Sequence, residues 1–499
     1  MARPWWWSRR ASRTLRRDRT VVGHAATPPF TLATVDCMRH LTFFVLALMC
    51  FPVNAHAATP LAPDAAEQAL KAWLAAFNDA DRDALTAFRA QYGMRPDTQG
   101  DLEFREEMGR LAVLEVVATT AAKAQVLVLP ATNDRAMRVT TTLNPDTGAA
   151  EFVFEGAETP AKYQPARMAL TDVLVEARTR LQALQGSNDL GGAFLVAEGG
   201  EIRMAWHGGL ADREHRVAVD RNTRFRLASL NKMFTAVAIL QLQDAGRLSL
   251  DDTLAKHLPA YPNPTVAASV TLRQMLTHTS GLGDIFGDKA TEHVDSLRTL
   301  QDYWAVFGAE PLAFAPGERD QYSNYAFVLL GSVIEAISGQ SYYDYVDEHI
   351  YRVAGMRSTG SAPESTPVAD RARPYTRVDG RWTLEKASLP WRGTSAGGGY
   401  STVDDLLKFG EALRTGKLLS PASLAMATSP QNHNAWYGHG FMVRGQGDAR
   451  LYGHEGGAPG ANAVFYVMPE QGYVLVGLSN VDPDAMGNVV NFVANRLPL

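Results

Sequence analysis

The chain has 499 residues, of which 46% are hydrophobic and 20% charged, and its formal net charge at pH 7 is −5. A length of this order predicts two to four domains with sizeable hydrophobic cores. The composition is typical of a globular protein. The weakly negative net charge argues against binding to nucleic acids or to acidic surfaces.

The N-terminal region carries the pattern of a secretory signal. Residues 1–37 are basic, and we interpret them as disordered or as the product of a start codon assigned too early. Residues 38–57 combine a short basic start, an apolar run and the cleavage motif Ala55-His56-Ala57. The apolar run, at about 13 residues, is too short to span a bilayer. The sequence therefore predicts an exported protein, periplasmic or secreted, that begins at Ala58 and has no membrane span.

The two cysteines, Cys37 and Cys50, both precede this cleavage site. Removal of the signal peptide leaves no thiol in the mature chain. A disulfide, a cysteine-ligated metal and a cysteine nucleophile are then all excluded.

Residues 58–165 are expected to form a small α+β domain. Apolar residues recur at helical spacing around Trp73, a second short helix follows, and four strand-like runs come next. The runs are 113–119, 125–129, 138–143 and 151–154. This order of elements resembles the NTF2-like folds. Such a domain either binds a partner or dimerises, or it is a spacer that packs on the next domain, and residues 159–165 are interpreted as a linker.

The main domain is expected over residues 168–499. A helix is predicted over 170–184 and a β-hairpin over 191–210, with Gly199-Gly200 at its turn. Residues 295–427 show helical patterns broken by loops, and strands are expected after residue 450.

One stretch in this domain pairs a serine with a lysine three residues later, Ser229 and Lys232, ahead of an apolar helix. Residues at positions i and i+3 share a helix face, so Ser229 and Lys232 would point the same way. The lysine amine can activate the serine hydroxyl if burial lowers the pKa of the amine. The unpaired N–H groups of a helix N-terminus favour a developing oxyanion. The alternative is an amphipathic helix with a solvated lysine.

Two later motifs carry the other candidate residues. Tyr322-Ser323-Asn324 precedes an apolar helix and supplies a phenol and an amide, unless it is an ordinary loop. His454-Glu455-Gly456-Gly457 precedes a strand, and its glycine pair lets backbone N–H groups face a site, unless His454 is only structural. The zinc motif His-Glu-x-x-His fails because residue 458 is Ala. We predict no metal and no cofactor.

Together, Ser-x-x-Lys, Tyr-x-Asn and His-x-Gly in this order resemble the serine β-lactamase-like family. That family includes class C β-lactamases, D-alanyl-D-alanine carboxypeptidases, D-aminopeptidases and esterases. The resemblance also includes the flanking stretches 272–282, 316–318 and 395–406. It implies an α/β (α+β) β-lactamase/transpeptidase-like fold, in which an antiparallel sheet is flanked by helices and an all-helical region is inserted.

The resemblance also implies roles for individual residues. Ser229 would be the nucleophile of an acyl-enzyme on a small-molecule or peptide acyl substrate, with Lys232 and Tyr322 moving protons. Asn324 would bind the acyl amide of the substrate. The N–H groups of Ser229 and Gly457 would form the oxyanion hole beside Gly456. His454 stands where β-lactamases have a lysine.

Two other functions are open at this point. One is a receptor or sensor that is acylated once and signals. The other is an α/β-hydrolase whose nucleophile is Ser395, within the formal Gly-x-Ser-x-Gly of residues 393–397.

The third motif also yields a hypothesis about substrates. His454 is mostly neutral near pH 7.5, and Glu455 adds negative charge if it faces the pocket. We therefore expect neutral esters, or amides without a free carboxylate, to be cleaved better than penicillins and cephalosporins. Proton exchange between His454 and Tyr322 would make activity fall below about pH 6.5.

Overall fold

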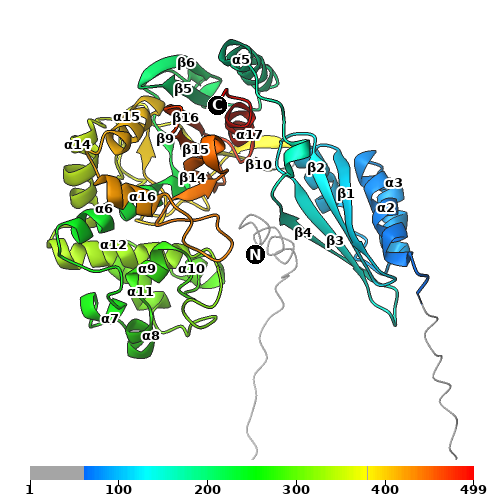
Figure 1. Cartoon of the computed structure of the whole chain (residues 1–499), viewed down its shortest axis with the longest axis horizontal. Coiled ribbons are helices and arrows are strands. Elements are labelled where there is room, and N and C mark those ends of the chain that lie inside the picture. Colours follow the sequence, from blue (N-terminus) through cyan, green and yellow to red (C-terminus); the bar gives the residue numbers. More distant parts are fainter. Residues whose placement is uncertain (1–60, 379) are drawn as a thin grey trace, which may run out of the picture.

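The computed structural model of this chain describes residues 61–378 and 380–499. The proposed signal peptide, Cys37 and Cys50 lie outside these residues. Within them, no helix is both long and apolar enough to cross a membrane. Figure 1 shows a smaller body, in which helices lie on a sheet, beside a larger body that holds the rest of the described chain.

The smaller body, residues 61–156, is called here the N-terminal unit. Its four antiparallel strands lie in sequence order and pack against three helices through a cluster of aromatic side chains. Trp73 stacks on Phe77 with ring centroids 4.7 Å apart and also contacts Phe152 and Phe154 of the sheet. The four predicted strands are confirmed, whereas helix α4 was not foreseen. The elements are α2 (Ala65–Asn78), α3 (Arg82–Gln91), α4 (Gln99–Met108), β1 (Leu111–Thr119), β2 (Lys123–Pro130), β3 (Met137–Leu143) and β4 (Ala150–Gly156).

The larger body is built on a six-stranded antiparallel sheet with the strand order β13-β14-β15-β16-β5-β6. The chain therefore starts the sheet with a hairpin, leaves for about 230 residues of other structure, and returns to complete it. The strands are β5 (Gly192–Glu198), β6 (Glu201–Gly208), β13 (Met442–Arg444), β14 (Leu451–Ala458), β15 (Ala461–Met468) and β16 (Tyr473–Ser479).

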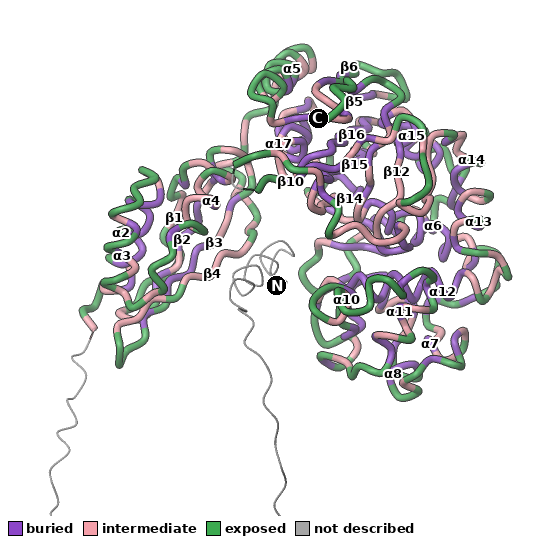
Figure 2. The backbone as a smooth tube through the Cα atoms, turned by 180° about the vertical axis from the view of Figure 1, so that it is seen from behind, coloured by how far each residue is buried: buried purple, intermediate pink, exposed green. Residues whose placement is uncertain are grey.

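Both faces of this sheet are covered, so its central strands are continuously apolar rather than alternating. Phe465 and its alternate neighbours pack towards α6 (Asn231–Asp244) and α15 (Val403–Arg414). Tyr466 and its alternate neighbours pack towards α5 (Leu170–Gly186) and α17 (Ala485–Ala494). Figure 2 shows the buried path through β15, β16 and α6 at the centre of the body.

The region between β6 and β13 is mostly helical and covers one face and one end of the sheet (Figure 1). Two short strands, β9 (Phe225–Arg226) and β12 (Tyr400–Ser401), pair beside the serine motif. The remaining strands are β7 (Leu210–Asp212), β8 (Val217–Ala218), β10 (Tyr375–Val378) and β11 (Arg381–Leu384). The remaining helices are α7 (Leu254–His257), α8 (Pro264–Ser269), α9 (Leu272–Leu276), α10 (Asp288–Glu292), α11 (Leu300–Phe307), α12 (Asn324–Ser338), α13 (Tyr342–Val346), α14 (Arg352–Ala354) and α16 (Pro421–Ala427).

The predicted antiparallel sheet flanked by helices is confirmed, but the inserted region is not all-helical, because it also holds the short strands β7 to β12. The alternative of an amphipathic helix after Ser229 is wrong, because residues Asn231 to Leu240 of α6 are all buried. A helix that is apolar all round belongs in the middle of a body, and α6 lies between the sheet and the helical region.

Candidate active site

Ser229 lies in a tight turn directly before α6. The 3-10 turn Ala228–Leu230 leads into the helix at Asn231, and Ala228 has the left-handed backbone angle φ +46°. Such a conformation in a non-glycine residue is strained and is often found beside a functional group. Ser229 is partly exposed while Lys232, one turn on, is fully buried. The solvated-lysine alternative is therefore wrong.

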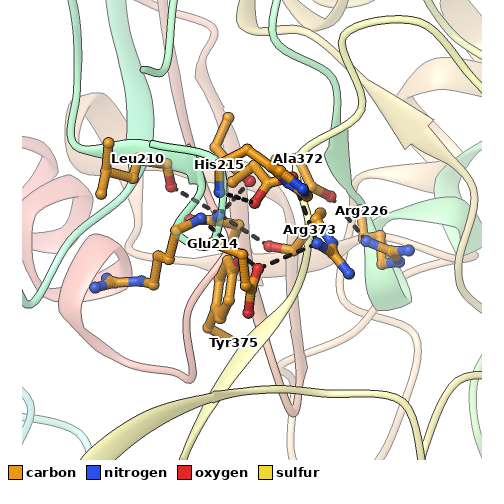
Figure 3. A network of polar contacts seen from close by, with 11 residues as sticks. Leu210, Glu214, His215, Arg226, Ala372, Arg373 and Tyr375 are labelled. Carbon is orange, nitrogen blue, oxygen red and sulfur yellow. Dashed lines mark hydrogen bonds and ion pairs between the residues drawn. The ribbon is translucent and has the colours of Figure 1, made fainter. Parts of the chain in front are cut away.

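A polar network holds the strand that precedes this turn (Figure 3). The Arg226 guanidinium donates to the carbonyl of Ala372 at 2.9 Å and pairs with Glu364 at 2.6 Å. Next to Ala372, Arg373 pairs with Glu214 at 3.1 Å. The strand β9 is thereby tied to the 371–375 segment, which fixes the start of the serine turn.

Three oxygens surround the Lys232 amine. Its Nζ lies 3.2 Å from Ser229 Oγ, 2.7 Å from Asn324 Oδ1 and 2.5 Å from the carbonyl oxygen of Ala396. Burial lowers the pKa of Lys232 to about 7, against a smaller opposing effect of the Asp284 carboxylate. A neutral amine has two N–H donors and one lone pair. The two carbonyl oxygens can accept the two N–H groups, which leaves the lone pair for the Ser229 hydroxyl.

The second motif lies where α12 begins. The Ser323 hydroxyl caps the helix by accepting from the Ala326 N–H at 3.0 Å. Tyr322 lies with its ring 4.7 Å from Lys232 Nζ and hydrogen-bonds with Ser229. Burial raises the pKa of Tyr322 well above its usual value, so this residue is a phenol rather than a phenolate at neutral pH.

Asp284, which sequence reasoning missed, completes the surroundings of Asn324. The Asn324 Nδ2 group donates to the two Asp284 carboxylate oxygens at 3.0 and 3.2 Å, while its Oδ1 accepts from Lys232. Asp284 itself is solvent-exposed. A chain of three hydrogen bonds therefore joins an exposed carboxylate to the candidate nucleophile. The predicted contact between Asn324 and a substrate stays a prediction, because its amide N–H group is already directed at Asp284.

His278 was noted in the sequence only as part of a flanking match, and it holds Tyr322 from both sides. The carbonyl of His278 accepts from the Gln321 N–H at 2.8 Å, and its Nδ1 accepts from the Ser323 N–H at 3.2 Å. Its ring lies 4.2 Å from the Tyr322 ring. Burial keeps the pKa of His278 well below its usual value, which preserves Nδ1 as an acceptor.

We expect His278→Asn to keep most of the activity and His278→Leu to lower kcat about 10- to 100-fold, because a misplaced proton-transfer group is costly. Asn tolerates the left-handed backbone of this position, φ +59°, and its Oδ1 can replace the ring acceptor. Both variants lose the ring, so the comparison isolates the acceptor and the backbone. Steady-state kinetics with thermal unfolding would check this. Equal kcat in two folded variants would contradict the proposed hold on Tyr322.

The third motif closes the site from the sheet. A Cβ on Gly456 would lie 2.3 Å from the carbonyl oxygen of Leu227 and 3.1 Å from the Ser229 nitrogen. Only glycine permits this approach of β14 to the serine turn. Gly457 follows on the same strand, and its share in an oxyanion hole with the Ser229 N–H stays a prediction.

The structure corrects the expectation for His454. Its Nε2 pairs with the Tyr437 hydroxyl at 2.8 Å and its Nδ1 with the carbonyl oxygen of Glu455 at 2.6 Å. The carbonyl can only accept, so Nδ1 carries the proton and Nε2 accepts from Tyr437. Burial lowers the pKa of His454 to about 3. Proton exchange with Tyr322 near pH 6.5 is therefore wrong, and Tyr437 is a partner that sequence reasoning missed.

Glu455 does not face the pocket, so it adds no negative charge there. Its carboxylate accepts from the Tyr466 hydroxyl and pairs with Arg135 at 3.1 Å, on the α17 side of the sheet. Neighbouring residues of a strand point to opposite faces, so His454 and Glu455 cannot both face the serine. The negative charge near the site comes from Asp284 instead.

Ser395 cannot serve as a nucleophile in this structure. It is fully buried, and its hydroxyl lies 3.5 Å from the carbonyl oxygen of Val328. The central sheet is antiparallel, whereas the nucleophile elbow of an α/β-hydrolase belongs to a parallel sheet. The segment contributes the Ala396 carbonyl to Lys232, and the carbonyls of Thr394 and Ser395 accept from Asn231 and Thr235 of α6.

Across residues 61–378 and 380–499, no group of His, Cys, Asp and Glu side chains could hold a metal ion. The groups that the structure brings into contact at this site are a hydroxyl, an amine and a phenol. This set can form an acyl-enzyme on Ser229 and transfer protons during its formation and breakdown.

Comparison with known proteins agrees with this arrangement. A family model described as Beta-lactamase matches residues 178–497. Penicillin-binding protein 4* of Bacillus subtilis (strain 168) is 31% identical over 330 residues, which is 62% of this chain and 72% of that protein. Esterase EstB of Burkholderia gladioli is 32% identical over 306 residues, 54% of this chain and 78% of the esterase. A D-stereospecific amidohydrolase from Streptomyces sp. has a TM-score of 0.53 at 27% identity, covering 64% of this chain and 97% of that structure.

Proposed function

Because this chain belongs to the beta-lactamase family and is a serine hydrolase related to the β-lactamases, we propose that it cleaves ester or amide bonds through an acyl-enzyme on Ser229. The observation that carries this proposal is the position of the Lys232 amine. Its Nζ contacts two carbonyl oxygens and lies 3.2 Å from Ser229 Oγ. For location we infer export, supported by the sequence pattern of residues 38–57.

In the proposed reaction, neutral Lys232 takes the Ser229 proton as Oγ attacks the acyl carbon. The oxyanion that forms is stabilised by the backbone N–H groups of Ser229 and Gly457. Tyr322, a protonated phenol beside both Ser229 and Lys232, passes a proton to the leaving alcohol or amine and is reprotonated from Lys232. Water then attacks the acyl-enzyme while Lys232 accepts a proton from it, and Lys232 returns this proton to Ser229 Oγ as the acyl bond breaks.

The charges around the site favour substrates without a carboxylate near the scissile bond. His454 is neutral at working pH, so the third motif offers no lysine-like cation. The exposed Asp284 carboxylate adds a negative charge three hydrogen bonds from Ser229. We infer that neutral esters and acyl groups with a free amino group are preferred over cephalosporins. This inferred preference is supported by the similarity to an esterase and to a D-stereospecific amidohydrolase.

The test compares kcat/KM for a neutral nitrophenyl ester, a D-aminoacyl nitroanilide with a free amine, and a chromogenic cephalosporin. Asp284→Asn is expected to lower activity on the aminoacyl substrate about 10-fold, because hydrogen bonds to charged groups contribute roughly 1.5–3 kcal/mol and the exposed site weakens them. The neutral ester should change less than about threefold, since Asn can still accept from Asn324. Asp288→Asn, an exposed acid on α10, is the matched control.

Faster turnover of the cephalosporin than of the ester in the wild type would contradict the substrate assignment. An equal effect of Asp284→Asn on both substrates would remove Asp284 from amine recognition. Sustained turnover well beyond one product per protein separates an enzyme from the alternative of a receptor that is acylated once.

A further inference from the structure

The N-terminal unit contacts the larger body, which contains Ser229, through charged side chains. Asp134, in the loop between β2 and β3, makes a two-pronged ion pair with Arg496 just after α17, at 2.5 and 3.0 Å. The next residue, Arg135, pairs with Glu455 at 3.1 and 3.3 Å. In Figure 1 the smaller body comes closest to the larger one near α17 and β10.

The loop that carries these two residues is braced by Thr159, which follows the N-terminal unit, and by the neighbouring Asn133. The Thr159 hydroxyl donates to the carbonyl oxygen of Asp134 at 2.8 Å and accepts from the Ala136 N–H at 2.9 Å. The Arg135 N–H donates to the Asn133 side chain at 2.9 Å. The acidic Asp134 and the basic Arg135 therefore lie side by side, and each faces a residue of opposite charge on the larger body. Such a pattern specifies one orientation more than it adds affinity.

The second pair ends on the strand that closes the active site. Glu455 lies between His454, whose Nδ1–H donates to the Glu455 carbonyl oxygen, and Gly456, which packs against the Ser229 nitrogen. Burial by itself raises the pKa of Glu455, but Arg135 and Arg444 outweigh it and lower that pKa to about 2. Of these two cations Arg135 is the closer, since Arg444 is 3.8 Å from the carboxylate.

We propose that the N-terminal unit is a working part of the hydrolase: the Asp134–Arg496 pair docks it, and Arg135 is a positioning residue for the active-site strand β14. The docking pair is mostly shielded from solvent, with 17% and 19% of the two side chains exposed, which distinguishes it from the weak ion pairs of an open surface. Loss of Arg135 leaves the partly buried Glu455 carboxylate with only the Tyr466 hydroxyl and the more distant Arg444, and a shift of β14 that admits water would compensate for the loss.

The first experiment uses the full chain and a neutral ester. Arg135→Gln is expected to lower kcat about 3- to 10-fold with KM changed less than about twofold, the range of effects typical for residues that act through a network. Arg135→Lys should retain most of kcat. Arg110→Gln, which breaks an exposed pair with Asp79 inside the same unit, should match the wild type.

A double variant separates positioning from simple packing. If the uncompensated carboxylate is what disturbs β14, then Glu455→Gln should restore kcat in the Arg135→Gln background, and the two changes should not add. An unchanged kcat in Arg135→Gln, or additive losses in the double variant, would overturn the positioning role.

The docking pair is tested by limited proteolysis of residues 157–168, which lie between β4 and α5. This measurement does not depend on catalysis. Asp134→Arg faces Arg496 with a like charge and should increase cleavage at least about fivefold while lowering kcat. The exchange Asp134→Arg with Arg496→Asp should restore both. Unchanged cleavage in Asp134→Arg would refute the docking pair. Increased cleavage with unchanged kcat would show that docking is not coupled to catalysis.

Discussion

Ser229→Ala is expected to reduce kcat/KM for any substrate of this protein by at least about 10³-fold, because the nucleophile has no substitute within reach. Lys232→Met keeps the buried volume of the lysine, removes the amine, and should cost a comparable factor. The double variant should be no worse than either single one, since the two residues act as one unit. Steady-state kinetics and labelling by a fluorophosphonate probe measure both effects.

The matched control is Ser395→Ala, which removes a hydroxyl that lies inside the protein. This variant should keep kcat within about threefold and should still be labelled at Ser229, because the hydrogen bond of the Ser395 hydroxyl to Val328 is long, at 3.5 Å. Probe labelling that survives in Ser229→Ala and disappears in Ser395→Ala would overturn the assignment of the nucleophile.

We further expect kcat/KM for a neutral ester to fall about tenfold between pH 8 and pH 6. Lys232 has a pKa of about 7, so it is mostly neutral at pH 8, and about one tenth of it is neutral at pH 6. Only the neutral amine can accept the Ser229 proton, so activity is lost as pH falls and reaches a plateau above about pH 8. The profile of kcat/KM reports this group in the free enzyme.

Two variants test whether the fall of kcat/KM at low pH, the acid limb of the profile, reports Lys232 rather than His454. The Asp284 carboxylate raises the pKa of Lys232, so Asp284→Asn should move the limb to lower pH. Glu455 raises the pKa of His454 and has no such effect on Lys232, so Glu455→Gln should leave the limb in place. A limb that moves with Glu455→Gln and not with Asp284→Asn would restore the histidine as the titrating group.

The sequence by itself determined the parts that depend on local pattern. The strands of the N-terminal unit, the hairpin β5–β6 and the helices α2 and α5 follow from side-chain periodicity and turn residues. The candidate nucleophile and amine, Ser229 and Lys232, were identifiable because their spacing places them on one helix face. Strand alternation could also have shown that Glu455 points away from the serine whenever His454 points towards it.

Only the tertiary structure decided how these groups are charged and which neighbours they have. Burial from every side lowers the pKa of Lys232 to about 7, and no local pattern around residue 232 reveals that burial. Asp284 and Tyr437 reach the site from loops distant in sequence, at separations that no motif encodes. The contact of Arg135 with Glu455 joins residues 320 positions apart and depends on how the N-terminal unit packs on the larger body. These features are set by long-range packing, which is why local sequence could not predict them.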